Sequence, residues 1–158
     1  MSSAANLVLN NFVYRIGAIT PTAGGKGFVY NARSTTLDPD ASPGMVRSFG
    51  VYFNESEEAH DVEDITERWA QSTWTVEIAY PVKSERGDEN LQSMILQDRH
   101  DIIKVLRTSD NKDGTSAAAP STTTGLIYRK FVGDELDRED PVTWIYTQTW
   151  ACMIQEPE

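Results

Sequence analysis

Apolar residues recur at helical spacing in two segments of the chain. In residues 3–19 the apolar stripe is formed by Val8, Phe12, Ile16 and Ile19. In residues 89–108 a longer stripe is formed by Leu91, Ile95, Ile102 and Leu106, with Met94 and Val105 at its margins. We therefore predict an N-terminal helix and, later in the chain, one long amphipathic helix.

Apolar and polar residues alternate with a period of two elsewhere, which is typical of strands with one buried face. The clearest case is residues 73–80, where Trp74, Val76, Ile78 and Tyr80 alternate with smaller or polar residues. Further strands are predicted in residues 27–33, 46–53, 126–132 and 144–154. The last two strands are joined through the acidic segment 133–141, which predicts a long antiparallel hairpin. The predicted fold class is α+β: a mainly antiparallel sheet crossed by one long helix, plus an N-terminal helix and long polar loops.

One acid interrupts the apolar stripe of the long helix. Asp98 lies on the same helical face as Ile95 and Ile102, and between them. An acid at such a position usually sits at the margin of the stripe and reaches water, and we favour that reading. The alternative is a buried carboxylate that pairs with an arginine or accepts backbone N–H groups, because an unpaired buried charge is costly.

Polar segments separate the periodic ones. Residues 55–67 carry seven acids and are predicted to be a charged connection between strands. Residues 110–125 are small, polar and of low complexity, so we expect a flexible loop that adds nothing to the core. Neither segment suggests a second folding unit, and 158 residues fit one domain spanning residues 1–158.

Composition narrows the classes of function. The formal net charge of −10 disfavours binding to nucleic-acid phosphates, since neutralising them takes Lys and Arg. The chain has no apolar run of the roughly 18 residues that a spanning helix needs, and its first residues lack the pattern of a signal peptide. A single cysteine, Cys152, can form no internal disulfide. We therefore expect no membrane partner, and a chain that stays in the cytoplasm where it is made.

The residues that could carry chemistry are few. His60 lies in the acidic segment, where a solvated charged loop is favoured over a weak divalent-cation site. His100 is expected to face solvent, and Cys152 to be a buried, inert thiol. The segment around Lys26 does not match a phosphate-binding loop, because Lys26 is followed by Gly27 and a strand instead of Ser or Thr and a helix. We predict no catalytic residues, no metal site and no cofactor, and hence no enzyme.

Aromatic and arginine side chains are the better candidates for contacts with other proteins, because both are enriched at the centres of interfaces. Trp74 and Trp150 occupy alternating strand positions and are expected in the core. An aromatic platform for sugars is a less favoured alternative. The predicted subunit-interface residues are Arg47, Trp69, Arg99, Arg107, Arg129 and Trp144.

Four stretches of the chain resemble a known family. They are residues 47–53 (RSFGVYF), 74–81 (WTVEIAYP), 98–106 (DRHDIIKVL) and 149–154 (TWACMI). With the order of the predicted elements, they resemble the tail terminator proteins of long-tailed bacteriophages over nearly all of the chain. The acidic segment 55–67 and the loop 110–125 depart from that pattern in length and composition.

The resemblance implies a structural role in the virion tail or neck, assembled in the host cytoplasm. Such proteins form a ring, usually a hexamer, on the last ring of the tail tube. The ring stops polymerisation of the tube (and of the sheath protein, where there is one) and presents a surface to the head connector or stopper protein. The family has no catalytic residues to carry over.

The acidity of the chain adds a hypothesis to this role: a negative lumen would repel genomic DNA and let it pass without specific binding. Two alternatives stay open. One is a head–tail connector, stopper or other neck protein; the other, of a different class, is a small ligand-binding or enzymatic α+β domain.

Overall fold

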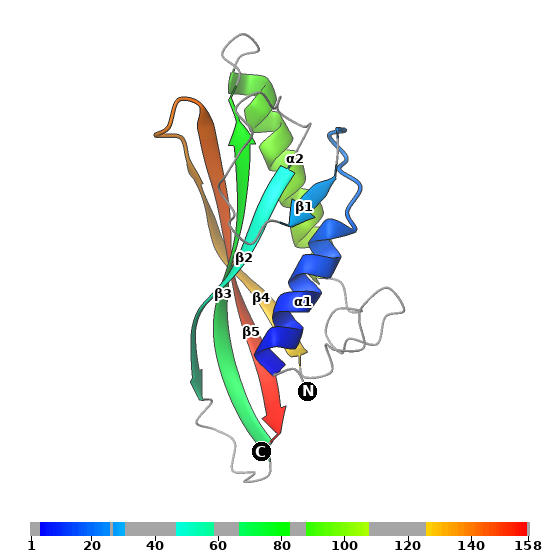
Figure 1. Cartoon of the computed structure of the whole chain (residues 1–158), viewed down its shortest axis with the longest axis vertical. Helices are drawn as coiled ribbons and strands as arrows, with labels where there is room; N and C mark the ends of the chain where they lie inside the picture. The colour runs from blue at the N-terminus through cyan, green and yellow to red at the C-terminus, as the bar shows by residue number, and fades with distance from the viewer. Residues whose placement is uncertain are drawn as a thin grey trace.

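The computed structural model describes residues 4–25, 27–30, 47–58, 67–82, 88–107 and 126–157. Two helices, α1 (Ala4–Gly17) and α2 (Asp88–Arg107), accompany five strands (Figure 1). The strands are β1 (Phe28–Tyr30), β2 (Arg47–Glu58), β3 (Glu67–Pro81), β4 (Leu126–Asp137) and β5 (Thr143–Pro157). They form one sheet in the order β1-β2-β3-β5-β4, in which only β1 and β2 run parallel among the described pairs. The predicted α+β class is confirmed.

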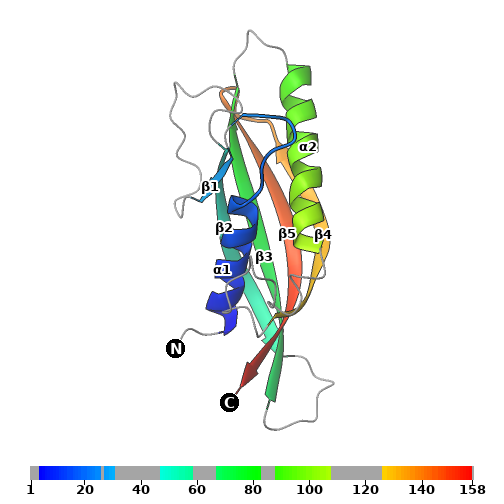
Figure 2. The same cartoon turned by 90° about the vertical axis from the view of Figure 1, so that its right-hand side faces the viewer.

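Both helices lie on the same face of the sheet (Figure 2). Their predicted apolar stripes point into the layer between helices and sheet, where Val8, Phe12 and Ile16 of α1 and Ile102 of α2 are fully buried. The same layer holds the alternating residues of β3 and β5, including Trp74 and Trp150, as predicted. No described helix covers the opposite face of the sheet. The described elements therefore form two layers, and we call the sheet face without a described helix the open face.

Strand pairing accounts for the elements that sequence periodicity misjudged. The strand predicted for residues 46–53 continues to Glu58, because Glu55 pairs with Thr73 and Glu57 pairs with Gln71 of β3. The first part of the predicted acidic loop after residue 132 likewise belongs to β4, which pairs with β5 as far as Asp137. Acidic residues have low strand propensity on average. At an exposed position beside an already formed strand, however, the backbone hydrogen bonds of the sheet outweigh that propensity.

Several other predicted boundaries were close. The helices were predicted within two residues at each end, and the hairpin of β4 and β5 is confirmed. β3 begins at Glu67, six residues before its predicted start, and Glu67 to Pro81 pair continuously with β5. Residues 34–44, 59–66 and 108–125, with His60 among them, lie outside the described residues, so the predictions made there stay predictions.

Candidate subunit interface

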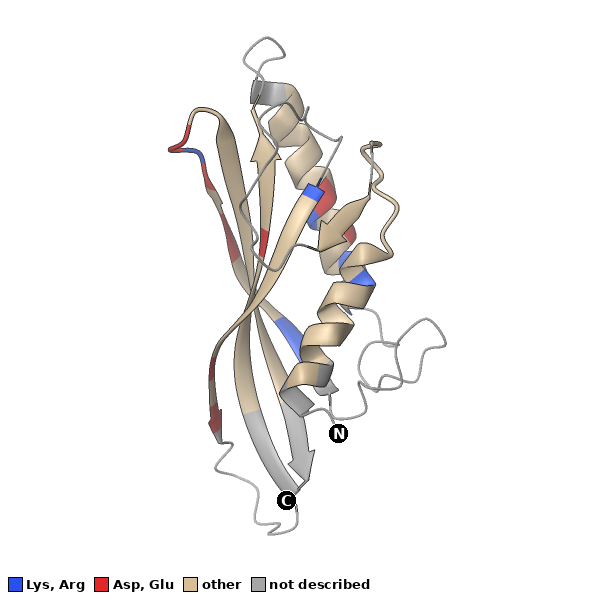
Figure 3. Ribbon diagram, in the orientation of Figure 1, with Lys and Arg blue, Asp and Glu red and all other residues tan. Residues whose placement is uncertain are grey.

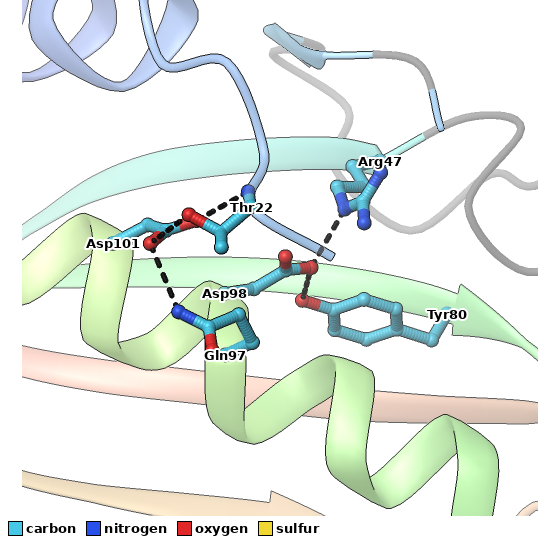
Figure 4. A network of polar contacts seen from close by, with 6 residues as sticks. All are labelled: Thr22, Arg47, Tyr80, Gln97, Asp98 and Asp101. Atoms are coloured by element: carbon cyan, nitrogen blue, oxygen red, sulfur yellow. Dashed lines mark hydrogen bonds and ion pairs between the residues drawn. The ribbon is translucent and has the colours of Figure 1, made fainter. Parts of the chain in front are cut away.

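Asp98 is buried, and the prediction that it reaches water is wrong. Its side chain and that of Arg47 are both 0% exposed, and Arg47 Nε donates to Asp98 Oδ2 at 2.7 Å. The Tyr80 hydroxyl donates to the same oxygen at 2.8 Å (Figure 4). Burial raises the pKa of the Asp98 carboxyl, while the hydrogen bond and charge of Arg47 act in the opposite direction. The three residues join α2, β2 and β3 at one buried point.

A second polar contact, at the surface, holds α2 one turn further along the helix. The backbone N–H and the hydroxyl of Thr22 donate to the two carboxylate oxygens of Asp101 at 2.9 and 3.0 Å (Figure 4). Thr22 lies in the turn after α1, where Gly24 and Gly25 have φ values of 86° and 84°. Glycine suits this turn because residues with a side chain rarely adopt positive φ. The turn after α1 is thus tied directly to the middle of α2.

Three of the predicted interface arginines gather where α2 borders β4, a region we name the α2–β4 margin. Arg99 and Arg107 each place the guanidinium carbon 5.6 Å from the centre of the Phe131 ring. Arg99 also forms a partly exposed ion pair with Asp134, at 2.5 Å. At this margin the side chains of α2 and β4 are already packed against one another.

Arg129 lies deeper in the α2–β4 margin than Arg99 and Arg107. Its guanidinium carbon lies 4.4 Å from the centre of the Phe12 ring, and it donates to the Leu106 carbonyl at 3.4 Å and to the Asn11 side chain. Burial lowers the pKa of Arg129 to about 10. Arg129 therefore joins α1, α2 and β4, and only part of it remains accessible to another subunit.

A shallow groove of about 290 Å³ runs along the α2–β4 margin. Its apolar walls are Ile95, Leu96 and Leu136, and its polar wall includes Arg99, Asp134 and Tyr146.

The polar wall of this groove continues into the core along β5. The Tyr146 hydroxyl donates to Asp134 at 2.7 Å and accepts from Gln148 at 2.9 Å, and Gln148 accepts from Trp150 Nε1 at 2.9 Å. Burial raises the pKa of the Tyr146 hydroxyl, so it stays protonated and available as a donor. This hydrogen-bonded row satisfies the polar atoms that β5 turns toward the core.

The other predicted interface residues are placed differently. Arg47 is fully buried and Trp144 is 5% exposed, so within this chain neither offers surface to a second subunit. Trp69 lies in β3, but its side chain is outside the described residues. Arg99 and Arg107, with part of Arg129, are the predicted residues that leave surface available at the α2–β4 margin.

Sequence reasoning missed the exposed apolar residues at the sheet edges. Phe53 shares a face of its strand with Phe49 and Val51, and its ring packs against Trp74 at 5.4 Å between centres. It is nevertheless 50% exposed, because β1 pairs with β2 only as far as Phe49. Val132 in β4 is 59% exposed. No periodicity marks an edge strand, since neighbours in a sheet are set by the whole fold.

Among the described residues, the side chains that could carry reactivity are the thiol of Cys152 and the imidazole of His100. Cys152 is buried as predicted, and burial raises the pKa of its thiol to about 11. His100 is exposed on α2, also as predicted. In the described ranges no three His, Cys, Asp or Glu side chains are grouped so that they could hold a metal ion. None of the described helices is both long enough and apolar enough to cross a membrane.

Comparison with known proteins supplies no argument about the role of this chain. No family model matches the chain, and no curated protein matches its sequence. One similar solved structure is described as "Virion of native gene transfer agent (GTA) particle". It shares 13% sequence identity with this chain at a TM-score of 0.47, over 97% of this chain and 92% of the other. A similarity at that level carries no argument about function.

Proposed function

We propose that this chain is a structural protein of a bacteriophage virion, and that it acts as a tail terminator. In this proposal several copies form a ring, six by analogy with the family it resembles, on the end of the tail tube. The ring stops tail polymerisation and offers its other side to the head connector or stopper protein. The chain catalyses no reaction and needs no cofactor in this role.

The open edges of the sheet support the proposal most. β4 forms one edge, and the part of β2 beyond its pairing with β1 forms the other, among the described strands. Each edge has an exposed apolar side chain, Val132 on β4 and Phe53 on β2. Two different open edges on one chain suit a heterologous contact, which repeats from copy to copy and closes into a ring. The order of helices and strands in the structure is also the predicted order on which the resemblance to tail terminators was based.

The distribution of acids fits passage of DNA through such a ring. Exposed acids gather at the hairpin end of β4 and β5, including Glu135, Asp137, Glu139 and Asp140, and on the far part of β2 (Figure 3). In this proposal acids that line the lumen repel genomic DNA, so that it passes without specific binding.

Locating the protein in partially assembled particles tests the proposal. Antibody labelling followed by electron microscopy should mark one end of head-free tails. Label on tail-free heads would contradict the terminator role and favour the first alternative, a connector, stopper or other neck protein.

The α2–β4 groove is the observation that favours a function of another class. Its volume of about 290 Å³ is just below the roughly 300–1,000 Å³ of typical small-molecule sites. A small ligand-binding or enzymatic domain would use this groove. Ligand-observed NMR with a fragment library separates the two functions, when the wild-type chain is compared with a Leu96→Arg variant that fills the groove. Fragments that bind only the wild-type chain would support the second function.

A further inference from the structure

The proposed function requires a ring but does not specify which surfaces of neighbouring copies are in contact. The inference below rests on that proposed function. We propose that the β4 edge of one copy packs beside the far part of β2 of the next copy. In this contact Lys130 faces Glu55 of the neighbour, and Val132 packs against its Phe53. The partner is thus a second copy of this chain, bound through two different sheet edges.

The register of the sheet places these residues at the same height on opposite edges. Glu55 pairs with Thr73, Thr73 with Ala151, and Ala151 with Lys130. Trp74 and Trp150, the next residues along, point toward the helices, so this row of residues points toward the open face. Lys130 and Glu55 therefore end one row of the sheet, on the same face and with opposite charges.

The adjacent row supplies the apolar part of the contact. Phe53 pairs with Trp74, Trp74 with Trp150, and Trp150 with Phe131, which precedes Val132. Phe53 therefore lies on the helix side of its edge, and Val132 occupies the register shift just after Phe131 on the other edge. Both residues adjoin the charged row, and both are at least half exposed. Neither Glu55 nor Lys130 has a side-chain hydrogen bond or ion pair among the described residues, so both charges remain available to a neighbour.

Both edges are irregular at this height. β2 has a register shift between Phe53 and Glu55, and β4 has one between Phe131 and Gly133. A bulge interrupts the regular row of backbone donors and acceptors, which discourages open-ended strand addition. The contact is therefore made by the side chains of the two rows, without a continuous hydrogen-bonded ladder.

The directions of β2 and β4 are compatible with copies related by rotation around a ring. β4 runs opposite to β2, because three antiparallel pairings separate them. Rotation about an axis roughly along the strands preserves strand direction, so β4 lies antiparallel to β2 of the next copy with the rows at one height. A contact between two β2 edges would instead bring Glu55 and Glu57 of both copies together, with like charges opposed. A two-fold contact between two β4 edges avoids that repulsion and is the competing arrangement.

Thiol cross-linking of the full chain tells the arrangements apart. We would prepare Phe53→Cys, Val132→Cys and the double variant at millimolar concentration, and treat each with a short bismaleimide. Native Cys152 is buried and should not react. The double variant should give a ladder of covalent oligomers that ends at one closed species, while each single variant should stay monomeric. Dimers formed by Val132→Cys alone would overturn the inference in favour of the two-fold contact, and so would the lack of any cross-linked species.

Charge reversal provides the matched test in solution. Lys130→Glu and Glu55→Lys should each weaken self-association about 2- to 10-fold in sedimentation experiments, since exposed ion pairs are individually modest. The double reversal should restore the wild-type association. Lys104→Glu makes the same charge change on the exposed side of α2 and should leave association unchanged. Failure of the double reversal to restore association would overturn the inference. Antibody labelling of tails tests the proposed virion role independently, because the position of the label does not depend on which sheet edges meet.

Discussion

Removing the Asp98 carboxylate should strongly destabilise the chain. In Asp98→Ala the buried Arg47 guanidinium loses its carboxylate and the buried Tyr80 hydroxyl loses its acceptor. Removing one partner of a buried ion pair typically costs about 3–5 kcal/mol, mostly because a charge is left uncompensated in the interior. A domain of this size has a free energy of unfolding on the order of 5–15 kcal/mol, so this single change would remove a large part of it.

Urea unfolding followed by tryptophan fluorescence measures this loss, with the midpoint and the slope fitted together. Asp101→Ala is the matched control, since it removes an acid from the same helix whose bonds to Thr22 are exposed. It should cost about 1 kcal/mol or less. An apolar double replacement, Arg47→Met with Asp98→Leu, should cost less than Asp98→Ala because no buried charge remains. A loss for Asp98→Ala no larger than that of Asp101→Ala would refute the reasoning.

Three further predictions concern the core, the thiol and the acids. Trp150→Ala should lower the free energy of unfolding by about 3–5 kcal/mol in the same urea experiment, because Trp150 is fully buried; a loss under about 1 kcal/mol would contradict its place in the core. At pH 8 the native Cys152 thiol should not react with Ellman's reagent until the chain unfolds, since a pKa of about 11 leaves only ~0.1% thiolate; prompt reaction would show that the thiol is accessible. In virions, Glu139→Gln with Asp140→Asn should increase DNA retained in the tail after ejection, and unchanged ejection would remove the hypothesis of a repelling lumen.

The periodic parts of the sequence predict the fold well. The stripe through Phe12 and Ile16, and the alternation through Trp74, Val76 and Ile78, each identify an element and its buried face. This works because burial on one face imposes a 3.6-residue or two-residue period directly on the sequence. The α+β class and the closing hairpin follow from the order of such segments.

The fate of single polar residues could not be predicted in the same way. Asp98 is buried because Arg47, 51 residues earlier in the chain, reaches it from β2. Glu55 belongs to a strand because β3 lies beside it, although its local sequence is typical of a loop. Both outcomes depend on neighbours brought together by the whole sheet, and no local pattern contains that information.

The same limit applies to the candidate interface. Sequence composition pointed to arginines and tryptophans, and it included Arg47 and Trp144, which the fold buries. It overlooked Phe53 and Val132, whose exposure follows from lying on edge strands. Edge positions become visible only when the order of the strands is known.

Electron microscopy of particles assembled without this protein tests the central claim most directly. The account predicts tail tubes of uncontrolled length, or finished tails that do not join heads. Tails of normal length, attached to heads in the usual proportion, would contradict it.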